Sequence, residues 1–255
     1  MFKVQRKPDF LIIGAQKAGT SSLFHYLSQH PDIDLPSEKE LHFFDIHYEN
    51  GIEWYIDLFP KKRFLSRKIT GEATPYYLFY PPAVERIHEH YSTIKLIVLL
   101  RNPIDRAYSH FQMERGRGVE PEPHFMRAVE LENERIADEE KRIKCGEINS
   151  SDNLRNYSYV RRGLYGKQIA LWLQYFLPRQ ILFIKSESFF SDTNIHLERI
   201  QNFLGVSYVP PTDTRIINSN KYPGLTDSER LKMEGYFRED GLLLRQLIGD
   251  QFSWF

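Results

Sequence analysis

Cysteine is nearly absent from this chain: Cys145 is the one cysteine among 255 residues. A lone cysteine excludes a disulfide within the chain and is typical of a protein kept in a reducing compartment. The sequence also has no apolar run near the roughly 18–20 residues that a membrane span requires. Residues 1–7 are polar and lack the apolar stretch of a signal peptide. We therefore expect a cytoplasmic protein with no membrane span.

An excess of charge is missing as well, because Lys and Arg together number 34 and so do Asp and Glu. A balanced chain gives no reason to expect a nucleic-acid partner or a membrane surface, although a local basic cleft stays open. Internal repeats and low-complexity tracts are absent too. With 41% hydrophobic residues, the length suits one large α/β domain that spans residues 1–255.

What the sequence does have is a regular alternation of short apolar runs with amphipathic stretches. The apolar runs predict buried strands at residues 10–13, 69–73, 94–100 and 181–184. Helices are predicted at residues 20–29, 81 onward, 103 onward, 127–144, 164–176, 195–204 and 227–248. This alternation predicts a doubly wound parallel β-sheet flanked by helices, in which ligands bind at the carboxyl ends of the strands.

The segment 116–157, here called the charged segment, differs from the rest. It opens with Gly and Pro, continues as a heavily charged helix at 127–144, and ends in a polar loop at 149–156. Its charges are typical of a solvated helix face. The alternative interpretation is a variable, mobile insertion that acts as a lid or binds a substrate.

The loop after the first predicted strand carries the strongest chemical pattern. Gly14 and Gly19 bound it, Lys17 lies between them, and three hydroxyl residues, Thr20 to Ser22, open the next helix. Backbone N–H groups, a helix N-terminus and a cation then surround one point, which suits an anion such as phosphate. A Walker A loop needs its lysine directly after the second glycine, so the fit to an ATP- or GTP-hydrolysing P-loop is poor. The plainer alternative is a glycine turn with an exposed lysine.

Two more polar residues, Arg101 and Ser109, follow the strand predicted at 94–100. Asn102 suits the cap of a helix whose first residue is Pro103, and Ser109 then lies two turns into that helix. Arginine offers a fork of donors that matches a phosphate. The pair therefore suits a second phosphate site, although a capping turn with a surface salt bridge explains it better when it is read alone.

The stretch KELHFFD, residues 39–45, places Glu40 and His42 two residues apart. In an extended segment both side chains point to one side, among apolar neighbours that desolvate them. A desolvated carboxylate has a raised pKa and acts as a general base. The alternative is an ordinary loop ion pair over buried aromatic residues.

Together these stretches resemble sulfotransferases that use 3'-phosphoadenylyl sulfate (PAPS). DFLIIGAQKAGTSSL resembles their phosphosulfate loop, RNPIDRAYSHF their 3'-phosphate motif R-[x]-P-x-x-[RS]-x-x-S, and KELHFFD the K-E-x-H-F-F-D of the heparan sulfate sulfotransferases. The likeness spans residues 9–254 and makes a soluble, bacterial-type member the expectation. It implies PAPS as the donor, 3',5'-adenosine bisphosphate (PAP) as a product and no metal. The reaction is then an in-line transfer in which positioning and charge stabilisation dominate.

The resemblance also implies a role for each motif residue. Lys17 stabilises the departing phosphate, Glu40 is the base that deprotonates the acceptor, and His42 lines the same pocket, so these three are the expected catalytic residues. The expected nucleotide-binding residues are Gln16, Lys17, Ala18, Gly19, Thr20, Ser21, Ser22, Arg101, Ser109 and Lys221. The expected acceptor-binding residues are Asp45, Glu72, Tyr76 and Tyr77.

Weaker likenesses concern the acceptor and the end of the chain. In GEATPYYL, residues 71–78, Ala73 stands where the heparan sulfate enzymes commonly have lysine, which argues against a highly anionic acceptor. NSNKYPGLT, which contains Lys221, stands in the place of a K-G-R-x-x-P loop. The acceptor stays open between a glycan, a lipid and another small molecule with a hydroxyl or amine.

Two other functions are compatible with parts of the sequence. A P-loop kinase for a small molecule would need magnesium-dependent ATP use, which the displaced lysine and the lack of an obvious Walker B carboxylate argue against. A nucleotide-binding protein without catalysis would keep the pocket but would not need Glu40 in an intact motif. The nearby His88 and His90 are expected on a helix surface rather than at a metal site.

Overall fold

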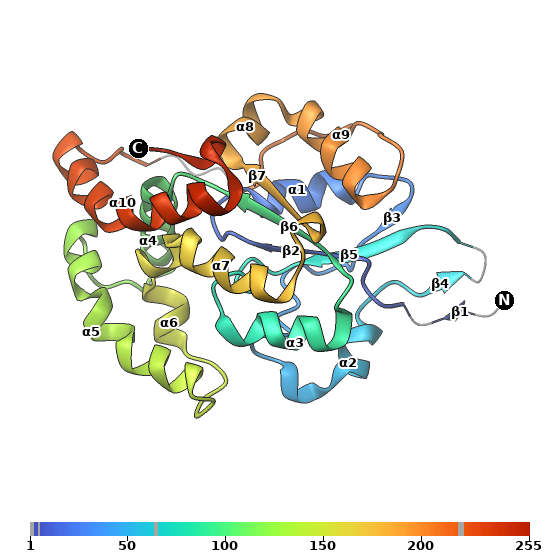
Figure 1. Ribbon diagram of the computed structural model, residues 1–255, viewed down its shortest axis with the longest axis horizontal. Helices are drawn as coiled ribbons and strands as arrows, with labels where there is room; N and C mark the ends of the chain where they lie inside the picture. Colours follow the sequence, from blue (N-terminus) through green and yellow to red (C-terminus); the bar gives the residue numbers. More distant parts are fainter. Residues whose placement is uncertain (1–2, 5, 64–65, 219–221) are drawn as a thin grey trace.

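The computed structural model describes residues 3–4, 6–63, 66–218 and 222–255. Within these ranges, five strands form one parallel sheet in the order β3-β5-β2-β6-β7, with helices on both faces (Figure 1). These strands are β2 (Phe10–Gly14), β3 (Ile33–Asp34), β5 (Ile69–Ala73), β6 (Lys95–Leu100) and β7 (Ile181–Lys185). Outside this sheet, β1 (Lys3–Val4) and β4 (Lys62–Arg63) pair antiparallel. The predicted single α/β domain with a doubly wound parallel sheet is confirmed.

The helices form three groups around the sheet (Figure 1). One face carries α1 (Thr20–Leu27), α8 (Ser186–Ser191) and α9 (Thr193–Leu204), and the other carries α2 (Ile52–Asp57), α3 (Pro81–Tyr91) and α7 (Tyr165–Tyr175). Beyond the carboxyl ends of the strands lie α4 (Pro103–Gly116), α5 (Phe125–Lys144), α6 (Asp152–Tyr157) and α10 (Asp227–Ile248). Short 3₁₀ helices are η1 (Tyr48–Asn50), η2 (Arg161–Gly163), η3 (Pro178–Gln180) and η4 (Asp250–Phe252). No helix in the described part of the chain is long and apolar enough to cross a membrane.

The two central strands explain the continuous apolar runs in the sequence. Strand β2 lies between β5 and β6, and each of its residues is buried. Strand β6 lies between β2 and β7 and is buried from Leu96 to Leu100. A strand covered on both faces by helices needs no alternation of apolar and polar residues. The core of the protein is therefore this sheet and the helix faces packed on it.

Most of the predicted elements agree with the structure to within two residues at each end. The strand at 69–73 and the helix at 227–248 have the predicted bounds. Asn102 caps α4, since its side-chain oxygen accepts hydrogen bonds from the N–H groups of Ile104 and Asp105. Gly205 follows α9 in the left-handed conformation, as expected of a C-terminal cap.

The prediction of a polar loop at 149–156 is wrong over most of its length, because residues 152–157 form α6. Ser151 caps this helix by accepting a hydrogen bond from the N–H of Leu154 at 2.9 Å. Leu154 is its one buried residue, so the helix has no apolar periodicity that a sequence reading would detect. Helices α2 and α8 were not predicted either, and at six residues each they are too short for a clear pattern.

The charged segment (116–157) is fastened to its neighbours by buried carboxylates. Glu132 on α5 accepts a hydrogen bond from the N–H of Arg161 at 2.9 Å. Glu120 accepts one from the hydroxyl of Tyr159 at 2.7 Å. Both glutamates are almost fully buried. These bonds hold the segment beside the carboxyl ends of the sheet strands, where the expected ligand site lies.

Candidate active site

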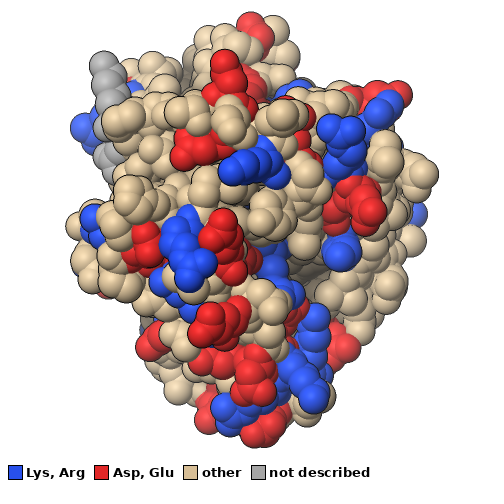
Figure 2. All heavy atoms as spheres, turned by 90° about the vertical axis from the view of Figure 1, so that its left-hand side faces the viewer, with Lys and Arg blue, Asp and Glu red and all other residues tan. Residues whose placement is uncertain are grey.

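A cleft with a volume of about 600 Å³ opens at the carboxyl ends of β2 and β6. Figure 2 looks onto this side of the molecule and shows basic and acidic side chains mixed around a central hollow. The loop after β2, the loop after β6 and the segment around Glu40 all contribute to its lining, as do α4 and α6. The three stretches that carried chemical patterns in the sequence therefore meet at one place.

The loop after β2 forms one wall of the cleft. Gln16, Lys17, Gly19, Thr20 and Ser21 line this wall. Because α1 begins at Thr20, the N–H groups of its first turn have no partner within the helix and are available at the wall. The anion-binding geometry expected from the spacing is therefore present.

Two residues predicted to bind the nucleotide lie beneath this wall instead of lining it. Ala18 and Ser22 are both fully buried, at 0% exposure. The carbonyl of Ala18 accepts a hydrogen bond from the hydroxyl of Ser186 at 2.8 Å, and the hydroxyl of Ser22 accepts one from the N–H of Ile217 at 2.9 Å. The backbone carbonyl of Ala18 and the side chain of Ser22 thus hold the loop in place. Lys221, also predicted for this site, lies outside the described residues.

The loop backbone turns sharply around Lys17. Lys17 has a φ of 67° and Gly19 a φ of 98°. A Cβ at position 19 would come within 2.8 Å of the Phe190 ring, so a larger residue does not fit there. This turn brings the lysine side chain to the cleft.

The ammonium group of Lys17 has no ion-pair partner among the described residues. Burial, together with the charge of Arg101, lowers the pKa of Lys17. Arg101 follows β6 directly and donates a hydrogen bond from its guanidinium to the carbonyl of Lys17 at 3.1 Å. Ser109 on α4 lines the same cleft. Two cations thus meet at one end of the cleft, and neither forms an ion pair within the described residues, an arrangement that suits a polyanionic ligand.

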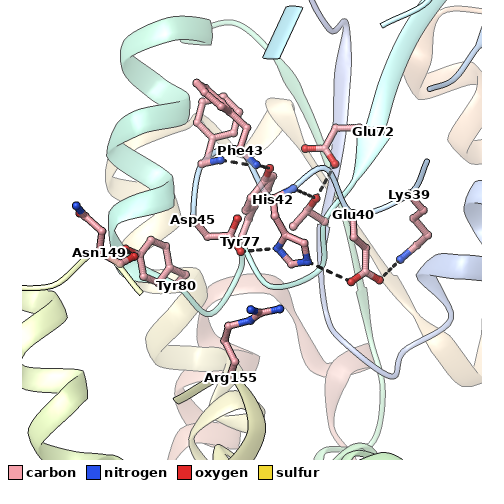
Figure 3. Close-up of polar contacts among 12 residues, drawn as sticks. Lys39, Glu40, His42, Phe43, Asp45, Glu72, Tyr77, Tyr80, Asn149 and Arg155 are labelled. Atoms are coloured by element: carbon pink, nitrogen blue, oxygen red, sulfur yellow. Dashed lines mark hydrogen bonds and ion pairs between the residues drawn. The ribbon is translucent and has the colours of Figure 1, made fainter. Parts of the chain in front are cut away.

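A chain of four ionisable side chains lies at another part of the cleft (Figure 3). Nδ1 of His42 lies 2.6 Å from Oδ2 of Asp45, and Nε2 of His42 lies 3.6 Å from Oε2 of Glu40. The ammonium of Lys39 contacts the other carboxylate oxygen of Glu40 at 2.5 Å. Glu40 and His42 line the cleft, whereas Asp45 lies behind them. The predicted pairing of Glu40 with His42 is therefore present.

The backbone of this segment is not the extended strand expected from the alternation. Glu40 and His42 have φ values of 64° and 52°, in the left-handed region that residues other than glycine rarely occupy. Hydrogen bonds hold this conformation: the N–H of Glu40 donates to the carbonyl of Ala73 at 3.0 Å, and the N–H of His42 donates to the hydroxyl of Thr74 at 3.3 Å. Strand β5 and the residue after it therefore set the position of the two side chains.

The prediction of a raised pKa for Glu40 is wrong. Burial alone would raise this pKa, but the hydrogen bond with His42 and the charge of Lys39 outweigh burial and lower it to about 2. For His42, burial alone would lower the pKa, whereas the hydrogen bonds with Asp45 and Glu40 raise it to about 9. At neutral pH an imidazolium therefore lies between two carboxylates, and Glu40 is ionised and able to accept a proton.

Three of the four residues predicted to bind the acceptor lie below the cleft. Asp45 is 1% exposed, and Glu72 and Tyr77 are 0% exposed. None of the three lines the cleft, whereas Tyr76 does. The structure therefore places these three side chains beneath the cleft and only Tyr76 in its lining.

These buried residues brace the segment that carries the ionisable chain. The hydroxyl of Thr74 donates to Oε2 of Glu72 at 2.7 Å and accepts the hydrogen bond from the N–H of His42. The hydroxyl of Tyr77 accepts a hydrogen bond from the N–H of Phe43 at 3.0 Å. Figure 3 shows this layer of contacts behind the chain. Glu72 and Tyr77 thus act on the site through the backbone of residues 42 and 43.

Glu72→Gln is expected to stabilise the protein at pH 8 but not at pH 5. Burial raises the pKa of Glu72 to about 7, from an ordinary value of 4.5. The folded state therefore binds this proton more tightly than the unfolded state, and the resulting stability is complete below pH 4.5 and lost as the pH rises through 7. Glutamine stays neutral, so we expect a gain in unfolding free energy of about 2–3 kcal/mol at pH 8. Denaturant unfolding at both pH values checks this, and an equal difference at pH 5 and pH 8 would contradict it.

A group of polar residues in the cleft was not predicted from the sequence. They come from the end of α4, from α6 and from η2, and they are Glu114, Arg117, Arg155, Asn156 and Arg162. Figure 3 shows Arg155 pointing from α6 toward the segment that carries His42. The local sequence around each of them is typical of a solvated polar surface, so only the tertiary structure brings them to the site.

No group of three or more His, Cys, Asp or Glu side chains in the described ranges is arranged to hold a metal ion. His88 packs against the rings of Tyr175 and Phe176, and His90 packs against Tyr48. Both histidines thus contact aromatic rings on the surface of α3.

Known proteins share both the sequence and the fold of this chain. A family model described as the sulfotransferase domain matches residues 7–221. Heparan sulfate glucosamine 3-O-sulfotransferase 6 of Homo sapiens is 35% identical over 276 residues, which cover 98% of this chain and 74% of that protein. Heparan sulfate glucosamine 3-O-sulfotransferase 3B1 of Homo sapiens is 33% identical over 97% of this chain, and the match spans 65% of that protein.

Solved structures agree with these relatives. A sulfotransferase from Alicyclobacillus acidocaldarius is 32% identical, with a TM-score of 0.79 over 96% of this chain and 97% of that one. Mouse sulfotransferase SULT7A1, solved in complex with PAP, shares the fold with a TM-score of 0.51 at 20% identity, over 92% of this chain and 66% of that one. The matched domain, the relatives and the common fold show that this chain belongs to the sulfotransferase family of enzymes.

Proposed function

We propose that this protein transfers a sulfuryl group from PAPS to a hydroxyl group of a glycan-type acceptor. The observation that carries the proposal is that a single cleft holds the cations Lys17 and Arg101, which form no ion pair within the described residues, together with the ionised carboxylate of Glu40. A donor with several negative charges and an acceptor that must lose a proton are the two reactants that such a cleft suits. The heparan sulfate glucosamine relatives support a glycan as the acceptor.

The cleft offers two sets of phosphate donors, which fits a nucleotide with phosphates at both ends of its ribose. Lys17 and the N–H groups at the start of α1 would hold the 5'-phosphosulfate. Arg101 and Ser109 would hold the 3'-phosphate. The ammonium of Lys17 supports this assignment, since it has no ion-pair partner in the described part of the chain and a ligand phosphate would supply one.

Glu40 is the proposed base, and Lys17 is the proposed cation that stabilises the leaving phosphate. PAPS supplies the sulfuryl group and a phosphate that leaves. Glu40 takes the proton of the acceptor hydroxyl and then releases it to solvent. His42, fixed by Asp45, keeps the carboxylate in place. Lys17 and the loop N–H groups stabilise the negative charge that develops on the departing phosphate.

The two rival functions fit the cleft less well. A small-molecule kinase would need the lysine spacing of a Walker A loop, and Lys17 precedes Gly19 by two residues. A binding protein without catalysis would have no use for a carboxylate held in left-handed backbone beside the phosphate site. The strained position of Glu40 therefore favours catalysis over simple binding.

PAP is expected to stabilise the protein far more than ATP does, because only PAP carries the 3'-phosphate. At a PAP concentration of 100 times Kd the gain in unfolding free energy is about 2.7 kcal/mol, which corresponds to a rise in Tm of about 5–10 °C. A thermal unfolding scan with PAP, ATP and AMP measures this. Arg101→Ala should remove the preference for PAP over AMP, whereas the exposed control Arg179→Ala should keep it. Equal protection by ATP would contradict the assignment of the donor.

Transfer of labelled sulfate from PAPS tests the acceptor class directly. The purified protein is incubated with ³⁵S-PAPS and with heparan oligosaccharides of graded sulfation, neutral glycans, glycolipids and phenols. We expect label in a glycan. Label in lipids or phenols alone would overturn the acceptor class while leaving the donor intact. Binding of PAP without transfer to any member of the panel would favour the non-catalytic alternative.

A further inference from the structure

Arg162 in η2 is a buried arginine without a carboxylate partner. Its side chain is 2% exposed, and no acidic group lies within ion-pair distance of it among the described residues. Burial lowers its pKa to about 10. Arginine is almost never fully buried unless it is paired, because removing its charge from water is costly. The guanidinium of Arg162, buried in the wall of the cleft, therefore depends on hydrogen-bond acceptors other than a carboxylate.

The guanidinium of Arg162 joins three segments that are far apart in the sequence. One nitrogen donates to Oε1 of Gln16 in the loop after β2. Another donates to the carbonyl of Arg155 at 2.8 Å, at the end of α6. The rings of Tyr76 and Phe79 lie 4.8 and 5.1 Å from it. Arg162 thus links the wall with the phosphate donors to the wall with Tyr76 and Arg155.

This contact determines which way the amide of Gln16 points. A guanidinium has only donors, so the atom of Gln16 that it contacts must be the carbonyl oxygen. The amide nitrogen, Nε2, is then left with two N–H groups, and no described residue accepts from them. Gln16 lines the cleft next to Lys17. Two neutral donors are therefore held beside the lysine by a residue 146 positions away in the chain.

We propose that Arg162 is a positioning residue: by holding Oε1 of Gln16, it presents the two amide N–H groups of Gln16 to the sulfuryl group of the donor bound at Lys17. The inference rests on the proposed donor. Arg162 thereby joins the donor site although it lies outside the loop after β2. Its guanidinium, with several N–H donors in one plane, suits this task. A lysine at this position would keep the charge but has a single nitrogen, which cannot hold Gln16 and the α6 carbonyl in one plane.

The test compares PAPS with PAP, which lacks the sulfuryl group, by calorimetry without an acceptor. In Arg162→Lys and in Gln16→Met we expect PAPS affinity to fall about tenfold while PAP affinity changes less than about twofold. In the double variant the loss for PAPS should be no larger than in either single variant, because Arg162 acts through Gln16. Independent losses that multiply to about a hundredfold would overturn the proposal. So would equal losses for PAP and PAPS, which a purely structural role predicts.

Arg106 supplies the matched control. It is also buried without a carboxylate partner among the described residues, it donates to the carbonyl of Tyr159, and it has no hydrogen bond with the loop after β2. We expect Arg106→Lys to change the affinities for PAP and PAPS by the same factor. A selective loss of PAPS affinity in this control would overturn the specific role of Arg162. A wild-type protein that binds neither nucleotide would instead overturn the proposed function.

Gln16→Glu tests the same contact in a variant that does not alter the buried arginine. The carboxylate keeps an acceptor for Arg162 and supplies the anion that this residue lacks, so the Tm of the free protein should rise by about 2–4 °C. The amide donors are gone, so the preference for PAPS over PAP should fall as it does in Gln16→Met. An unchanged or lower Tm, or an intact preference for PAPS, would overturn the proposal.

Discussion

Replacing Glu40 with glutamine is expected to lower turnover by about 10²–10⁴-fold, the range for loss of a general base. Glutamine fills the same space, and its one oxygen can still accept a hydrogen bond from Lys39 or His42, but it cannot act as a base. Since Glu40 belongs to the acceptor side of the cleft, the affinity for PAP should stay within about twofold. Steady-state turnover with the acceptor found in the labelling screen, together with PAP calorimetry, measures both effects.

The neighbouring Glu38 provides a control for this substitution. Glu38 is exposed and does not line the cleft, so Glu38→Gln should leave turnover unchanged. Near-normal turnover in Glu40→Gln would exclude the carboxylate as the base. A parallel loss of PAP affinity would show that residue 40 acts on the nucleotide instead of the acceptor.

Replacing Lys17 with methionine is expected to lower turnover by about 10²–10³-fold, the range for loss of one preorganised donor to a developing negative charge. Methionine keeps the length of the side chain and removes the cation. Unlike Glu40→Gln, this variant should also weaken PAP binding, because Lys17 interacts with the phosphate before and after transfer. The two variants thus differ in their effect on PAP, which separates the donor side from the acceptor side.

Lys232→Met is the control for the lost charge, because Lys232 is exposed on α10 and does not line the cleft. Both lysine variants are followed by turnover and by PAP calorimetry. Unchanged PAP affinity together with turnover within tenfold of the wild type in Lys17→Met would remove Lys17 from the donor site.

The sheet and its loops are predictable from the sequence because two physical signals agree there. Strands such as β2 and β6 are covered on both faces and read as unbroken apolar runs, and Asn102 and Gly205 mark helix ends through capping chemistry. Helix α6 lacks such a signal, since its stability depends on one buried leucine and on tertiary contacts. The parts of the fold that the sequence misses are the short elements with few buried residues.

The candidate site is predictable where local sequence determines it and not where packing does. The loop around Lys17 carries its own geometry, so its position at the cleft follows from its glycines and hydroxyl residues. The motif around residue 72 predicts that Glu72 lines the cleft. In the structure Glu72 lies in β5, which runs between two other strands and has side chains covered on both faces of the sheet. The contact of Arg162 with Gln16 joins residues 146 apart, and no local pattern reports it.

The left-handed backbone at Glu40 and His42 implies a trade-off between stability and activity. Conformations of this kind cost of order 1–3 kcal/mol each when the residue is not glycine. Glycine or asparagine would occupy both positions with less strain, and neither would supply the carboxylate or the imidazolium. Mutations that relieve such strain are easily found by selection for thermal stability alone. In this chain, residues 40 and 42 are therefore among the positions at which such selection would stabilise the fold and abolish its chemistry.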